Sequence, residues 1–426
     1  MEIAILFTAL VVFLIMGVPV AFVLILSSLL TVLYMGMNPV VVFQRLTAGM
    51  NIFALMAVPF FIYAGELMLH GAIADKLVRL ASAIIGHVRG GLGLVNVTTS
   101  VFLGGVSGSA IADASAVGSI MIPQMKARGY SVEYSVSITV TAAIIALILP
   151  PSHNMIIYSN SAGGMISIAD LFTAGIFPGL LMALMLMIAA YIVARWRGYP
   201  AEAFPGFAAL VRIFVVAFPG LLLILIIIGG VRSGIFTATE SSMIAVVYAF
   251  LVTLLVYRTL KWEEFKVATA QATRTTAMVL MLIGGAASFG WFMALFEIPA
   301  IMISFMNGIS DNPYVIFMLI NVILLFLGCF MDMSPLIIIC TPIFLPVVTS
   351  YGMDPVHFGM VLIVNLGIGL CTPPVGTVLF VGCAVGRVPI LSVVRHIWPF
   401  YIAGFATLMM VTYIPAISLY LPNALR

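Results

Sequence analysis

The segment 365–381, NLGIGLCTPPVGTVLFV, decides the fold of this chain. It is apolar enough for a membrane interior, but Pro373 and Pro374 interrupt it in the middle. Proline has no N–H and its ring clashes with the preceding helical turn, so this pair removes the donors that the carbonyls of Gly369 and Leu370 would use. A free carbonyl at membrane depth is costly unless it lines a cavity or meets a cation. The segment therefore predicts a spanning helix that is broken for a purpose.

A second proline pair indicates that the chain is a duplication. Pro150 and Pro151, in ALILPPSHN at 146–154, precede Pro373 and Pro374 by 223 residues. Other positions match at nearly the same offset: Phe102-Leu103-Gly104-Gly105 with Phe326-Leu327-Gly328-Cys329, Pro123 with Pro346, and Gly129 with Gly352. One such pair alone would be a common structural kink, but two at a fixed offset indicate a repeat. Matched breaks in two halves are typical of secondary transporters, which form a site near the membrane midplane.

The composition fits only a membrane protein. Of the 426 residues, 64% are hydrophobic and 7% are charged, whereas soluble domains are about half apolar and about a quarter charged. The net charge of +3 is spread between the spans and gives no basis for nucleic-acid binding. No cleavable signal peptide is expected, because the first apolar run is too long. Four cysteines lie in apolar runs without metal-type spacing and are expected to be packed thiols: Cys329, Cys340, Cys371 and Cys383.

The apolar runs predict an all-α polytopic protein that crosses a lipid bilayer several times, with about 20 residues for each span. The expected spans are 3–35 (one kinked helix or two short segments), 47–69, 168–194, 213–230, 239–257, 276–296 and 397–419, with broken spans at 132–158 and 358–381. The segments 90–126 and 313–350 predict re-entrant hairpins. The first is rich in glycine and serine at its centre, which permits close backbone contact, and the second is expected to turn near Gly328. Amphipathic segments at 72–85 and 261–274 are expected along the membrane surface, and 298–308 is a short arm.

The distribution of basic residues predicts that the two halves are inverted. If Met1 is cytoplasmic, fourteen Lys and Arg residues fall on the inner side and only Arg45, Arg232 and Arg426 fall outside. Cytoplasmic loops collect Lys and Arg, which favours this topology. The hairpins then enter the membrane from opposite sides, and their tips are expected to meet the broken helices near the midplane.

This arrangement predicts at least two Na⁺ sites, because carbonyls and half-helix C-termini suit a hard monovalent cation. The first set of candidate ligands is Gly104, Ser107 and Ser109 from the hairpin with Ala146, Leu149 and Ser152 from the break. The second set is Gly328 from the hairpin with Gly369, Thr372 and Val375 from the break. The two sets are equivalent under the repeat, because adding the offset of 223 residues to positions 146, 149 and 152 gives positions 369, 372 and 375.

Other polar and small residues at the breaks are candidates for the substrate or for structure. An anionic substrate is expected beside Asn154, Ser159, Pro374 and Gly376. No arginine lies at midplane depth in this topology, so recognition would depend on backbone N–H groups, on hydroxyls such as those of Ser159 and Ser161, or on an arginine drawn in from an edge. Asp113 and Asp332 are either functional intramembrane acids or caps of hairpin half-helices. His153 is either a proton or substrate contact or a structural histidine with its hydrogen bonds satisfied.

The combined motifs resemble a known family. The glycine-rich hairpin with Asp113, the two proline pairs, NLGIGLCTPPVG at 365–376 and VGCAVG at 381–386 resemble the large membrane subunit of tripartite ATP-independent periplasmic (TRAP) transporters. The resemblance covers essentially the whole chain. It implies a Na⁺-coupled, elevator-type secondary transporter, similar to the ion-transporter superfamily, in the bacterial inner membrane. It also implies an organic acid substrate, such as sialic acid or a C4-dicarboxylate, a periplasmic substrate-binding protein and a small four-helix membrane subunit.

With this resemblance the chain divides into scaffold and transport parts. The expected division is 1–86 first scaffold and arm, 87–160 first transport part, 161–194 closing helix, 195–212 linker, 213–309 second scaffold and arm, 310–385 second transport part and 386–426 closing helix. The alternatives are an ion or anion channel and a non-transporting structural subunit. An intramembrane enzyme is not expected, because HExxH, GxSxG and paired catalytic aspartates are absent from the sequence.

Overall fold

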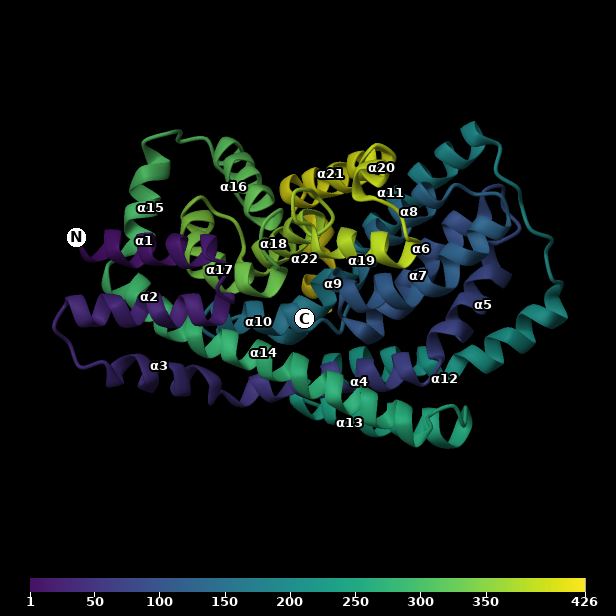
Figure 1. Cartoon of the computed structure of the whole chain (residues 1–426), viewed down its shortest axis with the longest axis horizontal. Helices are drawn as coiled ribbons and strands as arrows, with labels where there is room; N and C mark the ends of the chain where they lie inside the picture. Colours follow the sequence, from purple (N-terminus) through teal and green to yellow (C-terminus); the bar gives the residue numbers. More distant parts are fainter. Residues whose placement is uncertain (426) are drawn as a thin grey trace.

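The secondary structure of residues 1–425, which a computed structural model describes, is helical throughout, with no strand in that range. Figure 1 shows the broken helices and hairpin ends gathered in the middle of the molecule, with the long helix α14 (Trp262–Leu295) running along one edge. The prediction of an all-α fold is confirmed. In the described residues, six helices are long and apolar enough to cross a membrane, or eight if each bent pair is one span.

The N-terminal run is two helices and not one kinked helix. Helices α1 (Glu2–Ile15) and α2 (Val20–Tyr34) pack against each other. The chain turns between them at Gly17, whose φ of +76° suits glycine, and at Pro19, which precedes α2. Of the two expectations for 3–35, the kinked helix is wrong and the pair of short segments is confirmed.

The next part contains a later span than expected and the first arm. Helix α3 (Val40–Met50) takes up the first residues of the span expected at 47–69, and the span itself is formed by the 3₁₀ turn Phe53–Met56 and α4 (Ala57–His70). Helix α5 (Ile73–Ile85) is amphipathic as predicted. It buries an apolar stripe, including Leu77 and Leu80, against α6 and α12 and leaves Asp75 and Arg79 exposed.

The first hairpin and the first broken span are confirmed. Helix α6 (Gly91–Ser107) turns at Gly108 and Ser109 into α7 (Ala110–Ala127). The broken span is α8 (Val132–Ala143), the short α9 (Ile145–Ile148) and α10 (His153–Ser161). It bends by 52° across the proline pair.

The middle of the chain connects the two halves by long helices. Helix α11 (Ile168–Arg197) ends in a loop before α12 (Phe207–Arg232), and α13 (Ala238–Leu251) continues into a π-helical turn at Val252–Val256. The surface segment and the span expected at 261–274 and 276–296 form one uninterrupted helix, α14. It lies against α2, α3 and α4.

The second half repeats the hairpin and the break. The arm is α15 (Ile298–Asn307), the hairpin is α16 (Pro313–Gly328) and α17 (Met333–Ser350), and the broken span is α18 (Pro355–Gly369) and α19 (Thr377–Gly386). After the short α20 (Ile390–Val394), the last expected span is bent by 59° between α21 (Trp398–Tyr413) and α22 (Ala416–Ala424). The two helices together pass as the span expected at 397–419, and the bend lies at Pro415, which removes a helical donor.

Candidate functional site

The tip of the first hairpin lies directly on the first break. A β-carbon added at Gly104 would be 2.8 Å from the Cα of Ala146, so only glycine permits this approach of two backbones. Gly108, at the turn of the hairpin, lies against the carbonyl of Pro151 and the imidazole of His153. The hairpin and the break are therefore one packed unit.

The tip of the second hairpin meets the second break in the same way. A β-carbon at Gly369 would lie 2.7 Å from the Cα and 3.0 Å from the carbonyl oxygen of Gly328. The backbone N–H groups of Val375 and Gly376 donate to the carbonyl oxygen of Cys329, with N···O distances of 3.1 and 3.4 Å. These bonds fasten the far side of the break to the hairpin turn.

The two contacts bring helix C-termini together in pairs. Gly104 and Ala146 are near the C-terminal ends of α6 and α9, and Gly328 and Gly369 end α16 and α18. A helix C-terminus has partial negative charge and unpaired carbonyl oxygens. Each pair of ends therefore creates a place where a cation is favoured.

Helix N-termini meet in a complementary way. Asn154, near the start of α10, accepts a hydrogen bond of 3.3 Å from the hydroxyl of Ser334, near the start of α17. Helix α7 also packs along α19, where Gly118 in the middle of α7 contacts Val385 near the C-terminal end of α19. Helix N-termini have partial positive charge and free N–H groups, which favour an anion. The N-termini of α10 and α17 form such a place, and both this contact and that of α7 with α19 join a hairpin of one half to the broken helix of the other.

The break carbonyls of the second half are not free, contrary to expectation. The carbonyl of Gly369 accepts from the N–H of Thr372 at 2.9 Å, and the carbonyl of Leu370 accepts from the N–H of Val378 at 3.1 Å. The chain reverses sharply enough at the prolines for later N–H groups to reach back. A carbonyl oxygen has a second lone pair, so these bonds leave a position for a cation.

The predicted ion ligands lie near the two hairpin tips, and their hydroxyl groups differ in whether they already have a hydrogen-bond partner. The hydroxyl of Ser109 caps α7 by accepting from the N–H of Ala112 at 3.4 Å, and the N–H of Ser109 donates to the hydroxyl of Ser107. Thr372 donates its hydroxyl proton to the carbonyl of Ile368 at 2.8 Å. Ser152 is fully buried, and its hydroxyl has no hydrogen-bond partner among the described residues.

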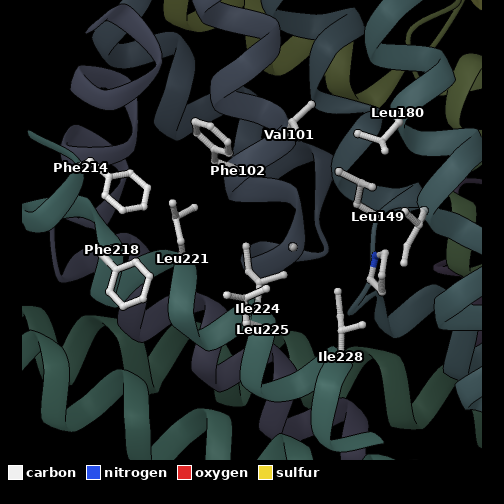
Figure 2. A pocket seen from close by; sticks show the side chains of 13 residues that line it. Val101, Phe102, Leu149, Leu180, Phe214, Phe218, Leu221, Ile224, Leu225 and Ile228 are labelled. Atoms are coloured by element: carbon white, nitrogen blue, oxygen red, sulfur yellow. The ribbon is translucent and has the colours of Figure 1, made fainter. Parts of the chain in front are cut away.

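The side chain of Leu149 lines an apolar cavity beside the first tip, together with Gly105 and Pro150. Figure 2 shows it with Val101 and Phe102 of α6, Leu180 of α11 and residues of α12 around an apolar cavity of about 420 Å³. Leu149 can therefore contribute only its backbone carbonyl to an ion site, which is how it was proposed as a ligand.

The candidate substrate residues are split between two places. Asn154, Pro374 and Gly376 lie at the breaks and hairpin ends. Ser159 does not join them, because it is at the other end of α10, donates to the carbonyl of Ile166 at 2.6 Å and lines a separate cavity beside the start of α13.

The two aspartates differ. Asp332 caps α17 by accepting from the N–H of Met333 at 2.9 Å, in agreement with the capping alternative. Asp113 is completely buried inside the first hairpin, and Ser109 takes the capping position instead. The capping alternative is therefore wrong for Asp113.

Two contacts of the site could not be found from the sequence. Ser334, which holds Asn154, corresponds to the apolar Ile111 at the repeat offset, so the duplication gives no signal for it. The hydroxyl of Tyr401 on α21 donates to the carbonyl of Cys371 in the second break, far along the chain from it.

All four cysteines are free thiols.

We expect Tyr401→Phe to destabilise the second break. The variant leaves the buried carbonyl of Cys371 without its donor, which costs about 1–3 kcal/mol. Tyr248→Phe is the matched control, since its hydroxyl donates to the carbonyl of Pro219 on α12, away from both breaks. Thermal unfolding of the purified variants in detergent checks the loss of stability in both, and Na⁺ titration should differ from wild type only for Tyr401→Phe. If both variants respond to Na⁺ as wild type does, Tyr401 does not contribute to the ion site.

Comparisons with known proteins identify the family. The model of the DctM component of tripartite ATP-independent periplasmic transporters matches residues 7–417. The sialic acid TRAP transporter large permease protein SiaM of Vibrio cholerae is 36% identical over 410 residues, covering 96% of this chain and 95% of that protein. The C4-dicarboxylate TRAP transporter large permease protein DctM of Rhodobacter capsulatus is 34% identical over 438 residues, covering 100% of both.

A solved structure supports the fold alone. The YdaH transporter of Alcanivorax borkumensis superposes with a TM-score of 0.64 over 89% of each chain, at 13% sequence identity. The chain is a multi-pass protein of the bacterial inner membrane. It belongs to the DctM family of large permease components of tripartite ATP-independent periplasmic transporters, which the sequence motifs predicted.

Proposed function

We propose that this chain is the translocating subunit of a Na⁺-coupled importer of organic acid anions. The proposed substrate class is that of the named relatives, sialic acid or a C4-dicarboxylate. A periplasmic binding protein delivers the anion, and a small four-helix membrane subunit completes the membrane part. The hairpins and broken helices move as one body against the remaining helices, as an elevator.

One observation supports the Na⁺ coupling most strongly. The C-terminal ends of hairpin and broken helix meet at Gly104 with Ala146 and again at Gly328 with Gly369, in the two halves of a duplicated chain. Two equivalent sets of partially negative helix ends favour two cations. The ligands are backbone carbonyls with the hydroxyls of Ser152 and Thr372, and oxygen donors suit a hard cation.

The anion is favoured by the opposite helix ends. Helices α10 and α17 meet at their N-termini through Asn154 and Ser334, and α7 lies along α19. A carboxylate among these ends is neutralised by helix dipoles and by bound Na⁺ nearby, which removes the need for an arginine. Binding of the cation and the anion is then coupled through the hairpins and broken spans, each of which contributes helix ends to both sites.

Uptake into proteoliposomes tests the proposal. The vesicles contain this chain with its small subunit, and the cognate binding protein is added outside with radiolabelled sialic acid or C4-dicarboxylate. We expect saturable accumulation only under an inward Na⁺ gradient. Accumulation without Na⁺ would contradict the coupling, and non-saturable flux down the gradient of the anion would indicate a channel instead.

Ser152→Ala separates a ligand role from a structural role. The hydroxyl of Ser152 is buried without a partner, so its removal relieves an unsatisfied polar group and leaves the folded state as stable or more stable. We expect the Na⁺ concentration for half-maximal uptake to rise by about tenfold, as loss of one oxygen ligand implies. Ser28→Ala is the control, because that buried hydroxyl donates only to its own helix at Leu24. An unchanged Na⁺ requirement in Ser152→Ala would exclude this ligand.

A further inference from the structure

The interior of the first hairpin contains a buried carboxylate with no partner. Asp113 on α7 is 0% exposed, and neither carboxylate oxygen has a hydrogen bond to any described residue. No Lys, Arg or His among residues 1–425 forms an ion pair with it. A buried charge without a partner is among the most costly features in a protein, so this carboxyl group must either take up a proton or be neutralised by a bound cation.

Further unpaired oxygens lie on the facing helix. Ser100 on α6 is the side chain that interacts with the Asp113 carboxylate, although no hydrogen bond of normal geometry joins them. The hydroxyls of Ser100 and Thr99 and the amide oxygen of Asn96 are all buried and without a partner among the described residues. Asn96 and Ser100 are one turn apart on one face of α6, so the unpaired oxygens form a short row.

The duplication shows that the hairpin fold does not need this polarity. At the offset of 224 residues that relates Gly104 to Gly328, Thr99 and Ser100 correspond to Ile323 and Leu324. At the offset of 223 that relates Pro123 to Pro346, Asp113 corresponds to Leu336, which is 1% exposed. The second hairpin thus forms with apolar side chains where the first has a carboxylate and hydroxyls.

We propose that the first hairpin holds a further Na⁺ inside its arms, with Asp113 as the charged ligand and Ser100 as a neutral one. The site is separate from the two tip sites, because its ligands are side chains on the facing sides of α6 and α7 and not carbonyls at the breaks. It exists in one half only. The choice of Na⁺ rests on the proposed function, whereas the presence of a cation rests on the unpaired oxygens.

Cation binding explains these oxygens better than trapped water alone. A water molecule donates hydrogen bonds to a carboxylate but leaves its net charge in the hydrophobic interior. A monovalent cation neutralises that charge and accepts lone pairs from carboxylate and hydroxyl oxygens, which are the donors hard cations prefer. The other side of the hairpin is closed by α8, where Thr139 accepts a hydrogen bond of 2.6 Å from Asn96.

Direct binding of radiolabelled Na⁺ to the purified full chain tests the proposal. We expect Asp113→Asn and Ser100→Ala each to bind one Na⁺ fewer per chain than wild type at saturation, or to need about tenfold more Na⁺. Ser28→Ala, whose buried hydroxyl bonds only within α2, should bind as wild type does. Ser100→Ala keeps the test valid if Asp113→Asn does not fold, and size-exclusion chromatography checks each variant.

The outcomes separate this proposal from the transport proposal. Wild-type stoichiometry and affinity in both Asp113→Asn and Ser100→Ala would overturn the internal site, as would a chain that binds no Na⁺, whatever uptake shows. Loss of one Na⁺ in these variants would establish the site even if uptake in proteoliposomes proved independent of Na⁺. Loss of Na⁺ only in Gly369→Ala would support the tip sites and contradict the internal one.

Discussion

Gly369→Ala is expected to reduce Na⁺-driven uptake strongly while the protein still folds. The new methyl group would meet the Cα of Gly328 at 2.7 Å and its carbonyl carbon at 2.8 Å. Backbone atoms inside two packed helices cannot move aside as a flexible side chain would, so the hairpin must separate from the break. Separation of the two C-terminal ends removes the cation position between them, and we expect uptake to fall by about tenfold or more.

The duplication supplies a second test of the same kind. Gly104→Ala places a methyl group 2.8 Å from the Cα of Ala146 in the first half and should have an effect of similar size. Gly290→Ala is the matched control, since that helical glycine on α14 has no atom within 4 Å of an added β-carbon. Initial uptake rates at several Na⁺ concentrations check all three. Normal uptake in Gly369→Ala and Gly104→Ala would show that the close approach serves packing only.

A cross-link between the first hairpin and α12 is expected to stop transport reversibly. A β-carbon at Gly105 would lie 2.9 to 3.1 Å from three side-chain carbons of Ile224, which brings the two β-carbons near the range of a disulfide. In an elevator the hairpin slides past α12, so Gly105→Cys with Ile224→Cys should lose uptake on oxidation and regain it on reduction. The native thiols are unpaired and mostly buried, and an oxidised wild type measures their contribution.

The control is a cross-link that joins parts expected to stay together. Gly220 on α12 would place a β-carbon 3.0 Å from Ile73 on α5, and both belong to the expected scaffold. Oxidation of Gly220→Cys with Ile73→Cys should leave uptake intact. If the Gly105 pair transports normally when fully cross-linked, the hairpin does not move relative to α12 and the elevator proposal is wrong.

The repeat offset made the centre of the fold predictable from the sequence. Because the proline pairs and the glycines at 104 and 328 recur at nearly one spacing, they located both hairpins and both broken spans. These elements depend on missing N–H donors and missing side chains, which are local properties that the sequence shows directly.

The outer helices were less predictable because their boundaries depend on neighbours. The sequence of α1 and α2 allows either one helix or two, and their mutual packing selects two. The charged start of α14 looked like a separate surface segment, but nothing in the chain breaks that helix. The helix continues from the charged segment into the span because no Gly or Pro separates them, a feature that hydrophobic periodicity alone does not detect.

Contacts between the repeats were outside the reach of the sequence. The bond from Ser334 to Asn154 joins a hairpin of one half to a break of the other, and the N–H of Val378 reaches back to Leu370 across the proline pair. The first bond arises from the three-dimensional fit of two halves, and the second from the sharp reversal of the chain at the prolines. The second bond also changed the interpretation of the break, from free carbonyls to carbonyls that offer only a second lone pair.

The most direct test of the central claim is a pair of cryo-electron microscopy maps of the chain with its small subunit, one in NaCl and one in choline chloride. Our account predicts density in NaCl alone at two equivalent positions, one beside Gly104 and Ala146 and one beside Gly328, Gly369 and Thr372, each surrounded by oxygen atoms. Identical maps, with both pairs of helix ends tightly packed and no density between them, would contradict it.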